Sequence, residues 1–517
     1  MQGGTDTGAQ LARRGYGWRN FPLVLAVVVS GQTATAGEWR VNTYLDFAEV
    51  YTDNVSLAPA GEEQDEFVTQ ISPGIGVSGQ SGRAKLNLNY RLQNLIYGHD
   101  LARSNSNHQL LANGNLELIK NWFFVDAKSS ISQQIVDADA SVPLDNFNIG
   151  NRADVITYGV SPYLKLRFGS YAAGEMRYGI DRVENQSTAL SDTEITQYSA
   201  RLGSGPNFNR LNWGMNFRHE EMSREFGPDS LRENASAVVR YRFHQTFNAL
   251  ARGGYENNDV VTTRSIKNGS YWSVGGEWLP SRYATLSATA GENNWDADVY
   301  LQPTARTQLH VGYQDLEVGL NPGGVWTADF SHHTRRSTWR LSYVEESTST
   351  QILQLADRQF FLVVDSNGNL LIDPRTGFPV VIVNNIFALT DEEFIRQRFQ
   401  GSVTWKSGKS DFVLGAYNEQ REFEISNNSE DVLGANASWI WRLKPRTQSI
   451  LGGGWQHRNP AGTNEADELW YASLGFNRSI SQDVNSSLEF RHTERASVRA
   501  GEDYDENRLT LQLSMRF

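Results

Sequence analysis

The segment Asn507–Phe517 reads NRLTLQLSMRF, and its side chains alternate strictly between apolar and polar. One face would carry Leu509, Leu511, Leu513, Met515 and Phe517, and the other Thr510, Gln512, Ser514 and Arg516. A period of two is typical of a β-strand with one apolar and one polar face. The apolar face, which ends on an aromatic ring, needs an apolar medium beside it, and that medium is either a protein core or a lipid.

The same alternation recurs along most of the chain after Trp39. Examples are AKLNLNYRLQ (84–93), NWGMNFRH (212–219), NASAVVRYRFH (234–244) and TWRLSYVE (338–345). Tight turns are expected near Ser81, Asn207, Ser281, Thr304, Arg335, Gly408 and Arg446. Long polar or acidic connections lie between the hairpins that these turns close. If tight and long connections alternate strictly, the sequence predicts about 24 strands, within a range of 22–26.

The composition of the two strand faces decides between a protein core and a lipid. A β-sandwich or a β-propeller would bury a face rich in Val, Ile and Leu. Here the apolar face is rich in Trp, Tyr, Phe and small residues, whereas the other face carries Asn, Ser, Gln, Glu and Arg. The polar face cannot form a dry core, because unpaired charges are costly away from water. The sequence therefore predicts an all-β, transmembrane antiparallel up-and-down β-barrel with a wet lumen.

The overall composition excludes several functions. The 517 residues include 45 Gly, 14 Pro and no Cys, which excludes disulfides, zinc-thiolate sites and thiol catalysis. Lys and Arg number 47 against 59 Asp and Glu, giving a net charge of −12. Nucleic acid is not expected as a partner, because phosphate contacts require a basic surface.

The N-terminal residues predict export from the cytoplasm. Arg13, Arg14 and Arg19 precede the apolar run FPLVLAVVVS, and Ala34 and Ala36 supply small residues before Gly37. The run is too short to span a bilayer core of about 30 Å, so a signal peptide is favoured over an anchoring helix. We expect residues 1–36 to be this signal peptide and residues 37–517 to be the barrel, in the outer membrane of a Gram-negative bacterium.

No grouping of residues predicts catalysis, a metal site or a cofactor. The nine His are scattered, and the one adjacent pair, His332 and His333, would point to opposite faces of a strand. TDNVS (52–56) and DSNGNLLIDP (365–374) resemble parts of calcium loops, but neither has the full spacing with a closing Glu, so turns are favoured. We expect a protein that is not an enzyme.

Arginine is the distinctive residue of the predicted lumen face. The candidate lumen-lining residues are Arg91, Arg177, Arg201, Arg218, Arg240, Arg242, Arg340, Arg396, Arg398 and Arg491. In one interpretation they pair with neighbours such as Glu175, Asp181 and Glu489 and stiffen the wall. In the other they form a basic stripe that guides an anionic solute, since guanidinium groups grip carboxylates and phosphates well.

Residues 350–393 form the longest predicted connection, a loop insertion that is a candidate plug or lid. The terminal strand of the chain resembles a known signal, which ends in an aromatic residue. The bacterial barrel assembly machinery recognises outer-membrane proteins by that signal. The residues that carry this resemblance are Leu509, Leu511, Leu513, Met515 and Phe517. It implies that the assembly machinery and outer-membrane lipid are partners.

Three stretches resemble one family: YTDNVSLAP (51–59), DEFVTQISPGIGVSG (65–79) and HHTRRSTWRLSYVEE (332–346). They are similar to outer-membrane β-barrel proteins associated with the PEP-CTERM sorting and exopolysaccharide system of proteobacteria. This chain departs from that pattern by its second His in HHTRRS and by a long insertion around Gln351 to Thr390. The resemblance implies a setting of biofilm polysaccharide and secreted surface proteins, and it supplies no catalytic residues.

Two functions remain open. The first is a porin-like transport pore that exports exopolysaccharide or another secreted product, with anionic polysaccharide and periplasmic export components as expected partners. The second is a non-conducting structural or docking barrel that anchors surface polysaccharide or sorted proteins. A lumen lined by arginine favours the first, and long acidic loops favour the second.

Overall fold

The computed structural model describes residues 38–148, 150–187, 190–263, 266–355, 360–362, 381–384, 390–462 and 465–517. The predicted signal peptide, residues 1–36, lies outside these ranges, as does DSNGNLLIDP. Among the described residues, no helix is long and apolar enough to cross a membrane.

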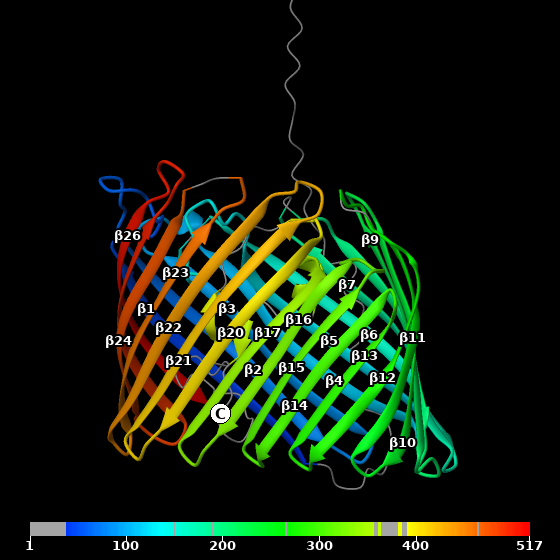
Figure 1. Ribbon diagram of the computed structural model, residues 1–517. Helices are drawn as coiled ribbons and strands as arrows, with labels where there is room; N and C mark the ends of the chain where they lie inside the picture. Colours follow the sequence, from blue (N-terminus) through cyan, green and yellow to red (C-terminus); the bar gives the residue numbers. More distant parts are fainter. Residues whose placement is uncertain are drawn as a thin grey trace, which may run out of the picture.

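Twenty-four strands form one antiparallel sheet that closes on itself (Figure 1). In the first half they are β1 Glu38–Thr52, β2 Glu66–Gln80, β3 Ala84–Tyr97, β4 Asn105–Ile119, β5 Phe123–Ile135, β6 Arg152–Phe168, β7 Ala172–Asn185, β8 Thr193–Ser204, β9 Leu211–Arg224, β10 Ser230–His244, β11 Phe247–Asp259 and β12 Gly269–Ser281. In the second half they are β13 Ala284–Glu292, β14 Asn294–Thr304, β15 Thr307–Leu316, β16 Gly323–His333, β17 Ser337–Thr348, β20 Phe394–Lys406, β21 Ser410–Phe423, β22 Ser429–Lys444, β23 Thr447–Asn459, β24 Asp467–Ser479, β25 Val484–Ala496 and β26 Tyr504–Arg516.

The remaining elements are short. They are the 3-10 helix η2 Leu101–Arg103, the helix α1 Thr350–Leu355, and the strands β18 Phe360–Leu362 and β19 Val381–Asn384, which pair only with each other.

The barrel closes where the first strand meets the last. β1 pairs with β26 from Tyr44 opposite Arg516 to Thr52 opposite Arg508, so every strand of the large sheet has two neighbours. Closure removes the free edges at which backbone N–H and C=O groups would lack partners in lipid. The predicted fold and the count of 24 strands are confirmed.

The two ends of the barrel differ in the length of their connections. The tight turns expected near Ser81, Arg335 and Gly408 share one hydrogen bond. In each, the hydroxyl oxygen of Ser81, Thr334 or Ser407 accepts the backbone N–H three residues later, at 2.9–3.0 Å. We call the end that holds the tight turns and Phe517 the short-turn end, and the opposite end the long-loop end (Figure 1).

The strict alternation of tight and long connections was wrong at one place. β13 and β14 are joined at the long-loop end by Asn293 alone, which has φ +59°. Asparagine tolerates this left-handed conformation better than most residues. Its side-chain amide donates to the Ser270 carbonyl at 3.0 Å and fixes the turn to the neighbouring hairpin.

Alternate residues of each strand face the lumen, and the register carries this assignment around the barrel. On β26, Tyr504, Glu506 and Arg508 are buried against inward-folded chain, whereas Leu509 and Leu511 are 44% and 55% exposed on the outer face. The same outer set contains every tryptophan of the barrel strands, for example Trp272 and Trp278 on β12. The apolar outer face therefore surrounds the whole sheet, as a lipid-facing surface requires.

Candidate functional site: a partly filled, cationic lumen

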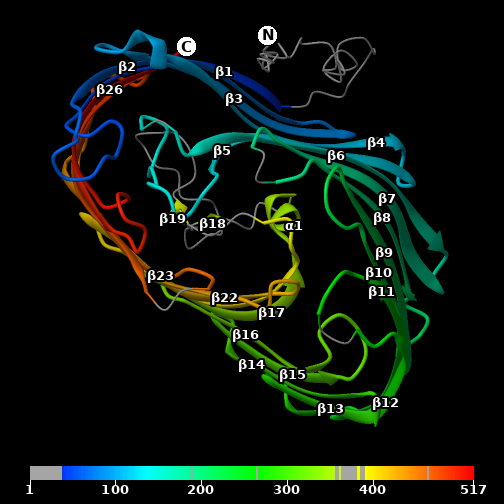
Figure 2. The same ribbon diagram turned by 90° about the horizontal axis from the view of Figure 1, so that it is seen from above.

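The described residues between β5 and β6, 136–148 and 150–151, fold into the barrel instead of extending from its rim (Figure 2). We call this segment the inward loop. Arg458 of β23 forms an ion pair with Asp139 at 2.6 Å, and the Arg495 guanidinium of β25 donates to the Ala138 carbonyl at 3.2 Å. The loop thus crosses the lumen from β5 and β6 to the wall formed by β23–β26.

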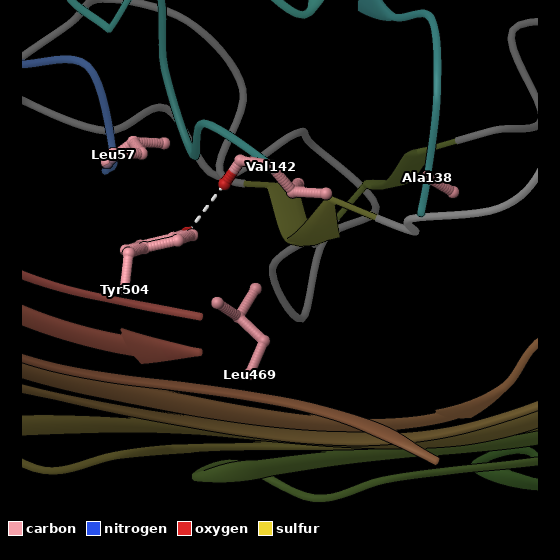
Figure 3. Packing of buried hydrophobic residues seen from close by; sticks show 5 residues of the cluster. All are labelled: Leu57, Ala138, Val142, Leu469 and Tyr504. Carbon is pink, nitrogen blue, oxygen red and sulfur yellow. Dashed lines mark hydrogen bonds between the residues drawn. The ribbon is translucent and has the colours of Figure 1, made fainter. Parts of the chain in front are cut away.

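A small apolar cluster seals the contact between the inward loop and that wall. Ala138 and Val142 of the loop pack with Leu57, Leu469 and Tyr504 (Figure 3). The Tyr504 hydroxyl donates to the Val142 carbonyl at 2.7 Å. Because a buried carbonyl without a partner is costly, this hydrogen bond fixes the depth at which the loop docks.

The end of the inward loop bridges the seam between the first and last strands. The Asn148 side-chain amide donates to Glu506 of β26 at 3.0 Å and to the Asn54 carbonyl, just beyond β1, at 3.4 Å. Glu506 also accepts the Thr52 hydroxyl of β1 at 2.8 Å. One buried carboxylate therefore ties together β1, β26 and the loop.

Charges on the inward loop are strongly paired. Burial would raise the pKa of the Asp145 carboxyl, but the guanidinium groups of Arg508 and Arg491 outweigh this effect and hold the pKa below its ordinary value. The pKa of Asp137 is also lowered, because backbone hydrogen bonds and Arg499, 3.0 Å away, outweigh its partial burial. Both carboxylates are therefore charged at neutral pH.

The predicted insertion, residues 350–393, is described only in part. Helix α1 lies inside the barrel beside β6 and β7, and β18 and β19 also lie within its outline (Figure 2). Near the end of the insertion, Glu393 forms an ion pair with Arg232 of β10 at 2.5 Å, and Asp391 accepts the Ser191 hydroxyl at 2.6 Å. The described pieces thus occupy the lumen at the long-loop end.

Burial of the inward-facing side chains shows where the lumen stays open. On β3, Tyr97 and Leu95 at the long-loop end are fully buried, whereas Lys85 at the short-turn end is exposed. On β22, Glu430 is fully buried and Lys444 is exposed. We call the exposed short-turn part of the lumen the vestibule. Its exposed inward-facing charges include Lys85, Arg167, Arg201, Arg240, Arg242, Arg442 and Lys444.

The structure places all the predicted lumen-lining arginines at inward-facing positions, but in two environments. Four of them are covered by inward-folded chain or neighbouring side chains: Arg91, Arg396, Arg398 and Arg491. Arg91 forms an ion pair with Asp46 at 3.8 Å, and Arg491 with Glu489 at 3.1 Å. These pairs belong to the wall-stiffening interpretation.

Arg396 and Arg398 share a single carboxylate. Glu419 of β21, which has no exposed surface, lies 2.9 Å from Arg396 and 2.5 Å from Arg398. Arg421, which is not among the predicted residues, is 2.8 Å from the other oxygen of Glu419. Arg396 has a second partner in Glu346 at 3.2 Å, so the cluster extends to β17.

The other predicted arginines are more accessible. Arg177 pairs with Asp126 at 2.6 Å, Arg218 with Glu220 at 2.7 Å, and Arg240 with Glu277 at 2.9 Å. Within the described ranges, Arg201, Arg242 and Arg340 form no ion pair, although Arg201 donates to the Asn216 side chain at 3.3 Å. Of the acidic neighbours expected from the sequence, Glu175 and Glu489 pair with arginine, but Asp181 pairs with Lys128.

Sequence reasoning missed several residues of this lumen. They are Arg421, Arg458, Arg495 and Arg508, which hold the covered half, and Lys165 and Arg167, which line the vestibule. All of them stand at the inward-facing alternate positions of their strands, so a count of every charge of that parity would have found them.

The terminal residues Leu509, Leu511, Leu513, Met515 and Phe517 lie on the outer face, as expected from their alternation. TDNVS forms a turn, in which the Asn54 side chain accepts the Ala58 N–H at 2.8 Å and donates to the Ala58 carbonyl at the same distance. His492, Glu494 and Asp505 bring candidate metal-binding atoms within 4.8 Å of one another. This group lies on the outer face near the long-loop end, away from the lumen.

The closed sheet, its apolar outer face and its charged lumen define a transmembrane β-barrel. No protein-family model matches the chain, and no curated protein matches it. Among solved structures, it is similar to the FrpB iron transporter of Neisseria meningitidis, with a TM-score of 0.48 and 10% identity over 92% of this chain and 81% of that one. The siderophore receptor PirA of Pseudomonas aeruginosa gives 0.42 and 9%, over 92% and 80%. A loop-deletion mutant of OmpT from Vibrio cholerae gives 0.33 and 10%, over 93% and 100%.

Proposed function

We propose that this chain is an outer-membrane barrel of a Gram-negative bacterium that passes exopolysaccharide or another secreted product outward, without catalysis of its own. The observation that carries the proposal is the vestibule, a cationic part of the lumen that remains exposed at one end of an otherwise partly filled barrel. A barrel whose only role was structural would not need exposed, unpaired arginines on its inner wall.

The orientation of the barrel supports outward passage. Outer-membrane barrels place short turns in the periplasm and longer loops outside the cell. In that orientation the vestibule opens to the periplasm, where a product destined for export arrives. Its positive charge raises the local concentration of an anionic product at the entrance. The setting of biofilm polysaccharide implied by the family resemblance agrees with such a product.

A second function is favoured by the filled long-loop half of the lumen. The inward loop is fixed by ion pairs to Arg458 and Arg508 and by the Tyr504 hydrogen bond. A barrel that is closed in this way could anchor surface polysaccharide or sorted proteins without conducting anything.

Conductance separates the two functions. Refolded protein would be inserted into planar bilayers, and single-channel currents would be recorded under a salt gradient. An export pore, which we call the conduit, would give steady channel currents whose reversal potential indicates selectivity for anions. Arg240→Ser combined with Arg242→Ser should reduce that preference, because both charges line the vestibule. Arg182→Ser, on the outer face of β7, is the matched control and should leave the selectivity unchanged.

Silent bilayers, from protein whose migration on a gel changes on heating as a folded barrel's does, would rule out the conduit and leave the docking function. A cellular measurement addresses the cargo. Deletion of the gene in its native host should leave polysaccharide trapped in the periplasm, and the wild-type gene should restore its release. Normal release from the deletion strain would contradict export by this protein.

A further inference from the structure

We propose that the vestibule contains a binding subsite for acidic polysaccharide, formed by Lys165, Arg167 and Arg201 where β6, β7 and β8 reach the short-turn end. The inference rests on the proposed function and deepens it, because it names the class of polymer and the place where the polymer first binds. A groove of about 480 Å³ lies at this position.

Small residues form the floor of this groove. Along one row of the sheet, Arg167 of β6 lies opposite Ala173 of β7, and Ala173 lies opposite Gly203 of β8. The neighbouring row contains Lys165, Glu175 and Arg201 in the same order. Because adjacent strands are about 4.8 Å apart, the cations on β6 and β8 stand roughly 10 Å apart across the floor. A chain of sugar rings can lie between them.

The cations are positioned without being neutralised. The Lys165 ammonium lies 4.4 Å from the centre of the Phe124 ring, and the Arg201 guanidinium donates to the neutral Asn216 side chain. Neither has a carboxylate partner within the described ranges. The one acidic residue of the groove, Glu175, accepts from Arg177 at 3.3 Å. The groove therefore presents free positive charge to a ligand, and guanidinium groups bind carboxylates well.

A second groove continues from Arg201 toward the long-loop end. It has a volume of about 360 Å³, and the amides of Asn216 and Gln314 line it together with Tyr271 and with Asn294, which is buried and accepts from Gln314 at 3.1 Å. Amides donate and accept hydrogen bonds, as sugar hydroxyl groups do. A ligand that satisfies both grooves carries carboxylates and many hydroxyl groups, which describes a uronic-acid polysaccharide better than a small anion.

The test is equilibrium binding of a short oligogalacturonate to the full-length protein in detergent, measured by titration calorimetry, with a neutral dextran oligomer as the second probe. We expect saturable binding of the acidic oligomer alone, weakened by salt. Lys165→Ser with Arg201→Ser should weaken it about tenfold or more, because the double substitution removes two charged hydrogen-bond donors to the carboxylates of the ligand. Lys85→Ser removes an exposed vestibule charge on β3, and it should change binding little.

Two further variants test the shape of the groove and the sign of its charge. A Cβ atom added at Gly203 would lie 3.7 Å from its nearest neighbour, the Trp213 carbonyl oxygen, so the Gly203→Leu variant should fold. Its side chain should then block the groove. Glu175→Gln should tighten binding, because it removes the only negative charge there.

The possible results separate the subsite from the conduit. Loss of binding in the double variant with retention in Lys85→Ser supports the subsite, even if the bilayers are silent. The subsite is overturned if Lys85→Ser weakens binding as much as the double variant does. It is also overturned if both oligomers bind equally, or if sulfate competes at equal concentration. Conducting channels without saturable binding also overturn it, and they leave the conduit standing.

Discussion

Glu419 forms ion pairs with three arginine side chains, and none of the four groups has much access to water. Taking charges out of water is costly, and here the cost is offset only by mutual attraction and short hydrogen bonds. Arg396 has an additional partner in Glu346, but Glu419 is the only ion-pair partner that the described residues give Arg398. The cluster links β20 and β21 on the lumen side.

We therefore expect Glu419→Gln to destabilise the barrel by about 3–5 kcal/mol, because it removes the ion-pair partner that the described residues give the buried Arg398 and weakens the pairing of Arg396 and Arg421. Glu494→Gln, at an exposed position on the outer face, should change stability by less than about 0.5 kcal/mol. Urea unfolding in lipid vesicles, followed by tryptophan fluorescence, measures both. Equal midpoints for the two variants would contradict this account of the cluster.

Alternation in the sequence predicted correctly that Arg398 and Arg242 both face inward, but it could not tell them apart. One is buried beside Glu419 and the other is exposed in the vestibule. The difference arises from depth along the barrel and from chain that folds over one position and not the other. Both depend on contacts between residues far apart in the sequence, which the pattern of a single strand does not contain.

At the scale of elements, the inward loop is the main departure from expectation. Most of the loop lies within DADASVPLDNFNIGNRAD (137–154), which predicted a long polar connection, and polarity alone places such a segment at the surface. The structure docks it inside because Ala138 and Val142 find an apolar partner in Tyr504, and because its Asp residues find arginines on β23–β26. The complementary partners are more than 300 residues away in the sequence.

Acid should loosen this loop. The pKa of Asp145 and that of Asp137 are lowered in the folded state, so the docking energy is fully present above their ordinary pKa of about 3.9 and is lost as pH falls below it. We expect protease cleavage within residues 136–151 to be slow from pH 7 to about pH 4 and faster below. A neutral protease at pH 7 and an acid-active protease below about pH 5 would provide the measurement at constant ionic strength, with each rate divided by the rate for an unfolded substrate at the same pH. Asp145→Asn should be cleaved faster even at pH 7, and unchanged cleavage of that variant would contradict the role of Asp145.

The Tyr504 hydroxyl gives a milder test of the same contact. Tyr504→Phe keeps the ring of the apolar cluster but leaves the Val142 carbonyl without its donor, at a cost of about 1–3 kcal/mol in docking. If the docked loop narrows the lumen, channel currents of this variant should fluctuate between two levels. Tyr255→Phe, on the outer face of β11, is the control. Steady currents identical to the wild type would show that the hydrogen bond does not hold the loop.

At the scale of the whole molecule, the sequence predicted the fold well because a closed barrel in lipid is governed by one repeated rule. Strand number, outer face and short turns all follow from alternation and turn residues. Alternation and turn residues do not predict which chain segments fill the lumen, because that depends on which loops fold inward. A basic stripe was one of two interpretations of the lumen arginines, and neither interpretation predicted that the exposed charges lie at the short-turn end.

The tryptophans on the outer face of the barrel allow a test of which face meets lipid. All tryptophans in the barrel strands lie on the outer face, Trp272, Trp326 and Trp405 among them. In reconstituted vesicles we expect lipids with brominated acyl chains to quench most of the fluorescence, while aqueous iodide quenches little. Protein unfolded in urea, with the same vesicles present, is the control and should show the reverse. Strong iodide quenching of the folded protein would place these rings in water.

The position of the inward loop also dictates an order of events during biogenesis. Its partners lie on β23–β26, at the far end of the chain, and its last residues touch both sides of the seam. The loop can therefore dock only after the last hairpin, β25 and β26, has formed and β26 has paired with β1. A barrel whose seam is still open would leave this segment accessible to a protease, whereas a closed barrel would cover it. Protection of the loop from protease would therefore report that the last strand has paired with β1.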